Sequence, residues 1–161
     1  IEMICGKRVL DYLNMVNDQN HQISVKLSAK MDKTAQAVER LQEENFRLKG
    51  QVGQLVDDMC RKEAERYAGS GSVLIFMDGM DADSVRKLAD AVTQTCQGCC
   101  AVFSGNADGS YKYAMGEKDG DLRQFTKEMN AKLNGRGGGK PFFVQGSVQA
   151  SEKEIRNFFE Q

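Results

Sequence analysis

The sequence contains no tryptophan, one proline and one histidine among its 161 residues. Because proline interrupts helices, a chain with a single proline can form long helices without a break. The one histidine, His21, lies in a helical N-terminal part, which leaves no credible Ser-His-Asp or Cys-His catalytic set. No apolar run approaches the ~20 residues of a membrane-spanning helix, so we expect no membrane partner.

Cysteine is present in an odd number and without the framework of a small secreted protein, which indicates reduced thiols and a cytoplasmic location. The five positions are Cys5, Cys60, Cys96, Cys99 and Cys100. The last three resemble half of a zinc knuckle, but no second pair stands at a suitable spacing. We therefore expect buried thiols and no metal site in this chain.

Charge is nearly balanced, at −1 overall, so the protein has no global basic field to attract nucleic acid. Residues 121–140 form a local exception, because five Lys and Arg side chains face only two acidic ones and give +3. Nucleic-acid binding would have to use this patch. The chain also begins at Ile1 rather than Met, so we expect it to be a piece of a longer protein.

Residues 1–68 carry apolar side chains at helical and then heptad spacing, which predicts a helical arm with a narrow apolar seam. We expect the seam to support dimerisation through Val38, Leu41, Asn45, Leu48, Val52 and Leu55. A buried Asn at such a position fixes register and partner number at a cost in stability. The heptad frame shifts between Leu27 and Met31, which favours two helices, about 6–29 and 33–67, packed as a hairpin; one continuous helix is the alternative.

Residues 69–161 hold most of the glycines and alternate between strand and helix patterns. The predicted order is β-α-β-β-α-β-α, a mixed sheet with helices against it, following a Gly/Ser boundary at 69–72. The predicted strands are 73–77, 99–103, 111–115 and 143–148, and the predicted helices are 81–94, 119–134 and 152–159, with a turn at 105–109. Asp78, Asp81 and Asp83 are interpreted as turn and cap residues rather than metal ligands.

One stretch, 134–143, concentrates glycine and positive charge between the last predicted helix and strand. Glycine lets another molecule approach the backbone, successive N–H groups can form an anion site, and Arg136 and Lys140 favour phosphate. The spacing does not fit a Walker A loop. The alternative is a hairpin loop without a ligand. The candidate nucleic-acid-binding residues are Arg123, Lys127, Lys132, Asn134, Gly135, Arg136, Gly137, Gly138, Gly139, Lys140 and Phe142.

The stretch 133–141, with Gln145-Gly146 after it, resembles the signature of the domain that accompanies DHH phosphoesterases and closes alanyl-tRNA synthetases. The opening stretch 1–10 resembles the end of the alanyl-tRNA editing domain, and the helical arm fits the connection between the two. The resemblance spans nearly the whole chain. It implies that residues 1–68 form a helical coiled-coil arm, of which residues 1–10 are a remnant of the editing domain. It also implies that residues 69–161 form a globular α/β domain like C-Ala.

The resemblance implies a C-terminal module that binds tRNA, at the elbow of tRNA-Ala, and supports a homodimer. It favours a parent that deacylates mischarged tRNA-Ala with zinc held in a missing upstream editing domain. The alternatives are a module of alanyl-tRNA synthetase or a substrate-binding subdomain of a DHH-type phosphoesterase. In each case the fragment itself is expected to have no catalytic residue, no cofactor and no metal. Phe142 is expected either to stack on a base or to lie in the core beside Phe143.

Overall fold

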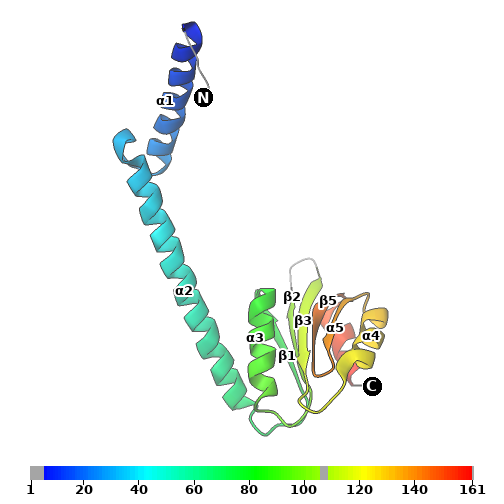
Figure 1. Cartoon of the computed structure of the whole chain (residues 1–161). Coiled ribbons are helices and arrows are strands. Elements are labelled where there is room, and N and C mark those ends of the chain that lie inside the picture. The colour runs from blue at the N-terminus through cyan, green and yellow to red at the C-terminus, as the bar shows by residue number, and fades with distance from the viewer. Residues whose placement is uncertain (1–5, 106–108, 161) are drawn as a thin grey trace. The chain divides into compact units, whose positions relative to one another are not determined.

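The computed structural model describes residues 6–105 and 109–160, which form two compact units, Ile1–Gly53 and Gln54–Gln161. Long helices come first and a mixed sheet with helices follows (Figure 1). This order confirms the predicted α/β class with an N-terminal helical arm. The predicted turn at 105–109 falls mainly outside the described residues, as does half of the opening stretch.

The first unit contains α1 (Lys7–Lys26), a short 3₁₀ helix η1 (Met31–Lys33) and the start of α2 (Thr34–Arg66). The frame shift between Leu27 and Met31 predicts two helices, and the structure has the break between the helices at these residues. Asn20 holds the junction: its Nδ2 donates to the Met31 carbonyl at 2.9 Å, and its Oδ1 accepts from Thr34 Oγ1 at 2.8 Å. The break is therefore a bonded corner.

The two helices of this unit do not show the side-by-side packing expected of a hairpin. Their apolar side chains stay exposed, with Leu13 at 56% and Leu41 at 55%, and α1 contacts η1 where the chain turns (Figure 1). A seam that fits a coiled coil needs the matching seam of another helix. The packing predicted for the hairpin is therefore wrong, because the chain turns at the corner held by Asn20 and does not lay α1 along α2.

The second unit is built on a five-stranded sheet in the order β1-β2-β3-β5-β4. Only the pair β1–β2 is parallel, and the other neighbours are antiparallel, so the predicted mixed sheet is confirmed. The strands are β1 (Val73–Asp78), β2 (Cys100–Gly105), β3 (Ser110–Gly116), β4 (Arg136–Lys140) and β5 (Phe143–Gln149). Four of these strands were predicted, and β4 was not.

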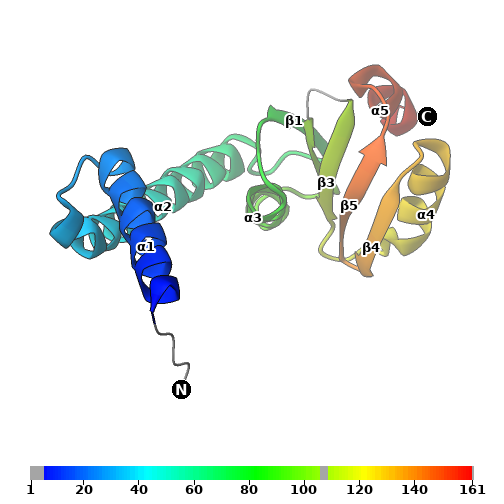
Figure 2. The same cartoon turned by 90° about the horizontal axis from the view of Figure 1, so that it is seen from above.

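Helices cover both faces of this sheet (Figure 2). On one face α3 (Ala82–Thr93) and residues 54–66 of α2 pack over a core around Leu88 and Val102. On the other face α4 (Leu122–Lys132) and α5 (Glu152–Phe159) pack over a core around Phe103. Burying both faces of the strands explains their continuous apolar runs.

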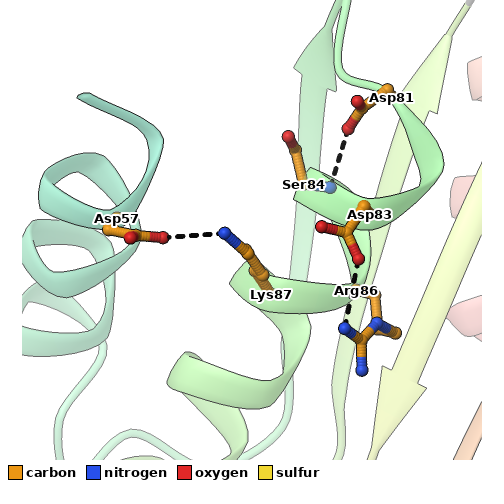
Figure 3. A network of polar contacts seen from close by, with 6 residues as sticks. All are labelled: Asp57, Asp81, Asp83, Ser84, Arg86 and Lys87. Atoms are coloured by element: carbon orange, nitrogen blue, oxygen red, sulfur yellow. Dashed lines mark hydrogen bonds and ion pairs between the residues drawn. The ribbon is translucent and has the colours of Figure 1, made fainter. Parts of the chain in front are cut away.

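Side-chain caps begin the helices where the sequence indicated them. Asp81 accepts a hydrogen bond from the Ser84 backbone N–H at 2.8 Å and so caps α3, which confirms its interpretation as a cap residue (Figure 3). Ser151 opens α5 with the predicted capping box. On the exposed side of α3, Lys87 Nζ lies 3.1 Å from Asp57 Oδ1 of α2 (Figure 3).

Candidate nucleic-acid interface

The glycine-rich stretch is an edge strand, β4, paired antiparallel with β5 through a turn at Pro141 and Phe142. The predicted loop with convergent N–H groups is therefore wrong, because the N–H groups of a strand point alternately to opposite sides. Glycine is depleted in strands, so local sequence favoured a loop here. Backbone pairing with β5 therefore stabilises a strand that the glycines themselves disfavour.

Packing explains the glycines at 137 and 139. A Cβ on Gly137 would lie 2.4 Å from both the Gln145 carbonyl oxygen and the Tyr113 hydroxyl. A Cβ on Gly139 would lie 2.3 Å from the Phe143 carbonyl oxygen. Nothing lies within 4 Å of a Cβ on Gly138, so the fold does not require glycine at that position.

Asn130 on α4 ties this strand to the helix below it. Its Oδ1 accepts from the Tyr113 hydroxyl at 3.1 Å, and its Nδ2 donates to the Gly137 carbonyl at 3.4 Å. Its backbone carbonyl accepts from the Gly135 N–H at 2.8 Å. Asn134 turns the chain between helix and strand with a positive φ of 49°. These hydrogen bonds fix the distance between β4 and α4.

The sheet register defines a surface that we call the open face. Residues paired across neighbouring strands share a face, and α3 lies over β2 and β3 on this side, leaving β5 and β4 uncovered in the described part of this unit (Figure 2). The open face consists of Lys112, Arg136, Gly138, Lys140, Gln145 and Ser147. It is a polar platform with three cations.

Two of these cations are available to a ligand. Among the described residues, Arg136 and Lys140 take part in no ion pair, and both are exposed. Lys112 is half-buried and lies near Asp81, since its charge contributes to the lowered pKa of that carboxyl, behind the hydrogen bonds from Ser84. Positive potential is thus strongest along β4.

Phe142 stands at the tip of the β4–β5 turn, 49% exposed, with Lys140 Nζ 5.8 Å from its ring centroid. Its neighbour Phe143 is the residue that packs against the core. The interpretation of Phe142 as a core residue is therefore wrong, and its ring is open to stacking.

The structure separates the basic residues of α4 from those of β4. Arg123 is held by Asp121, with its Nη2 2.6 Å from Oδ2, and these bonds lower the pKa of Asp121 to about 2. Lys132 lies over the Phe158 ring at 5.2 Å. Lys127 is exposed beside β4 on the side opposite the open face. The single patch expected from the sequence is divided between two sides of the strand.

Other candidate sites carry less chemistry. Cys60, Cys96 and Cys100 are buried, as predicted, and burial raises the pKa values of Cys99 and Cys100 to about 12. No group of three potential metal ligands occurs among the described residues. Within the same ranges no helix is long and apolar enough to span a membrane.

A family model described as the DHHA1 domain matches residues 70–161, which is more than half of the chain. The chain belongs to the DHHA1 domain family. The matched region covers the sheet with helices α3, α4 and α5, including β4 and the open face. The predicted resemblance to the domain that accompanies DHH phosphoesterases is confirmed.

Similar proteins place this DHHA1 chain among relatives named alanine–tRNA ligase. That of Psychrobacter sp. is 24% identical over 95% of this chain and 18% of its own length, and that of Acholeplasma laidlawii is 30% identical over 49% and 9%. The C-Ala domain of Aquifex aeolicus alanyl-tRNA synthetase has 18% identity and a TM-score of 0.49, covering 58% of this chain and 92% of that domain. The chain spans less than a fifth of the length of the curated relatives it matches.

Sequence reasoning missed Lys112, Gln145 and Ser147 as members of the site. Lys112 lies on β3, well before the glycine stretch, and joins it only through the β3–β5 pairing. Alternation of Gln145 and Ser147 with buried Val144 and Val148 was the available signal. It indicates a face of β5, but only the strand order shows that no helix covers it.

Proposed function

We propose that this DHHA1 chain is the tRNA-binding and dimerisation module of a larger enzyme that acts on tRNA-Ala. The observation that carries the proposal is the open face, where Arg136 and Lys140 lie exposed on an uncovered strand beside the exposed Phe142 ring and form no ion pair with any described residue. The relatives named alanine–tRNA ligase indicate that the nucleic acid is tRNA. They favour a ligase as the parent over the editing hydrolase that the resemblance favoured.

The open face suits recognition by shape rather than by base sequence. Arg136 and Lys140 bind phosphates, and their separation by Gly138 keeps the surface between them flat. Phe142 stacks on a base that is exposed at the tRNA elbow, and Gln145 and Ser147 offer neutral hydrogen-bonding groups beside the cations. Charge provides affinity and the neutral groups provide orientation.

A salt-dependent titration tests the proposal. The double variant Arg136→Ala/Lys140→Ala should bind a tRNA-Ala transcript about tenfold or more weakly, and the slope of log K against log salt should fall by about two. Arg86→Ala/Lys153→Ala removes the same charge from exposed sites off the open face and should bind like the wild type. Equal affinity of the wild type and the β4 variant would refute the assignment.

We also propose that the seam of α2 pairs with the seam of a second copy. The seam residues Val38, Leu41, Leu48, Val52 and Leu55 are between 39% and 69% exposed, and they recur at heptad spacing. Asn45 interrupts this apolar row and sets the register of the pair. Sedimentation of Leu41→Ala/Leu48→Ala should show monomer where the wild type shows dimer. Asn45→Leu should change the association state, and an unchanged state would contradict the role of Asn45 in register.

A further inference from the structure

A pocket of about 390 Å³ opens on the side of the sheet covered by α4 and α5, near the start of β1. Its volume is within the ~300–1,000 Å³ range of ligand pockets. Most of its lining side chains are apolar, and these are Val73, Leu74, Leu122, Phe125 and Phe159. The rings of Phe125 and Phe159 have centroids 5.4 Å apart and planes inclined at 64°. A flat ligand can therefore stack on one ring and meet the other edge-on.

One carboxylate of this pocket, that of Glu117, is available to a ligand. Glu117 is half-buried and forms no ion pair with any residue that the structure describes. Burial and then the charge of Glu117 raise the pKa of Cys99 to about 12, so the carboxylate lies near a thiol that also lines the pocket. The second carboxylate, Asp121, is already bound by Arg123. Because a carboxylate only accepts hydrogen bonds, the ligand must present donors to Glu117.

The pocket adjoins the turn that carries the exposed Phe142 ring. The backbone N–H of Glu117 donates to the Phe142 carbonyl at 3.0 Å, and that of Leu122 donates to the Pro141 carbonyl at 2.7 Å. The segment between β3 and α4, which forms one wall of the pocket, is thus bonded to the β4–β5 turn. A nucleic-acid strand with one base stacked on Phe142 can present a neighbouring base to the pocket.

Guanine matches these groups better than the other bases do. Its Watson–Crick edge has two adjacent donors, N1–H and the N2 amino group, for the two oxygens of one carboxylate. Adenine and cytosine present an amino group beside a ring acceptor, and uracil presents one donor between two carbonyls. Proteins that read single-stranded RNA hydrogen-bond such edges and stack the base on aromatic side chains. A phosphate would be repelled by the carboxylates, so the pocket suits a base rather than the RNA backbone.

We propose that this pocket takes an unpaired guanine of the bound RNA, whose N1–H and N2 amino group donate to Glu117 while its ring stacks on Phe125 or Phe159. The inference rests on the proposed function, since it requires RNA on the open face and on Phe142. The cations of the open face provide affinity without base preference, and the pocket adds a preference for guanine.

The experiment measures binding of the full chain to fluorescein-labelled single-stranded RNA pentamers, UUGUU and UUAUU, by fluorescence anisotropy. Because the two backbones are identical, phosphate contacts cancel in the ratio of affinities. Wild-type protein should bind UUGUU about tenfold more tightly than UUAUU. Inosine in place of guanine removes only the N2 amino group and should lower the affinity about three- to fivefold. Equal affinity for the three pentamers would overturn the guanine site.

A pair of variants tests the part played by Glu117. Glu117→Leu removes both acceptor oxygens and should bind UUGUU and UUAUU equally. Glu128→Leu removes the same charge from an exposed position of α4 outside the pocket and should keep the preference for guanine. A Glu117→Leu variant that keeps the preference would overturn the proposal. The inosine comparison uses wild-type protein, so it tests the site even where Glu117→Leu does not fold.

A third variant separates the guanine site from the proposed function. Arg136→Ala/Lys140→Ala should weaken binding of both pentamers while leaving their ratio unchanged, because the pocket is intact. Equal wild-type affinity for the two pentamers would overturn the guanine site and leave tRNA binding in place. Failure of the wild type to bind the tRNA-Ala transcript would overturn the proposed function and the guanine site together.

Discussion

The helical unit and the globular unit bury their apolar side chains in different ways. In residues 6–53 the apolar side chains are regularly spaced, yet most remain exposed. In residues 54–160 the spacing is less regular, yet strands and helices bury two cores, one on each face of the sheet. Regular spacing therefore predicts a helix and the need for a partner, whereas a complete core comes from residues far apart in sequence.

Truncating one aromatic ring in each unit gives the largest expected contrast. Phe103 is 0% exposed and contacts the rings of Phe76, Tyr113 and Phe159, whereas Phe46 on α2 is 81% exposed. Phe103→Ala should lower the free energy of unfolding by about 3–5 kcal/mol, through lost burial and a cavity. Phe46→Ala should change it by less than about 0.5 kcal/mol. Urea unfolding followed by circular dichroism measures both.

A comparable loss of stability in the two aromatic variants would contradict the contrast between the units. It would mean that Phe46 is buried in solution, most simply against another copy of α2. Repeating the unfolding at two protein concentrations distinguishes these cases, because a stability gained from association depends on concentration.

Glycine substitutions sharpen the comparison at a smaller scale. A Cβ on Gly137 would meet backbone and the Tyr113 hydroxyl, so Gly137→Ala should cost about 1–3 kcal/mol of stability. Gly53 on α2 has nothing within 4 Å, so Gly53→Ala should stabilise the helix by up to about 1 kcal/mol. Gly138→Ala, one residue along the strand, is the matched control and should fold normally. Thermal unfolding of Gly137→Ala at the wild-type temperature would show that β4 can move away from Tyr113.

Local chemistry accounts for what could be predicted from the sequence. The apolar runs of β1 and β2, the cap at Asp81 and the capping box at Ser151 each depend on neighbouring residues, and the structure shows all of them. Strand β4 could not be predicted in the same way, because its glycines are explained by Tyr113 and by the backbone of β5. The division of the basic patch also required the strand order. Site geometry here depends on pairing between distant segments.

The ion pair between Asp57 on α2 and Lys87 on α3 should give the smallest effect, although it lies where α2 joins the globular unit (Figure 3). The hydrogen bond from Lys87 to Asp57 raises the pKa of Lys87 above its ordinary value of 10.5. A group whose pKa is raised by folding stabilises the folded state. This stabilisation is fully present below the unfolded-state pKa and is lost as the pH rises through the folded-state pKa. At neutral pH the contribution is fully present but screened by solvent, since both side chains are exposed. Asp57→Asn should therefore return the pKa of Lys87 toward 10.5 in an NMR titration without a measurable change in melting temperature. The opposite outcome is a melting temperature lowered as far as in Phe103→Ala. It would mean that this ion pair, rather than the packing of Cys60 and Ala64, holds the end of α2 against the sheet.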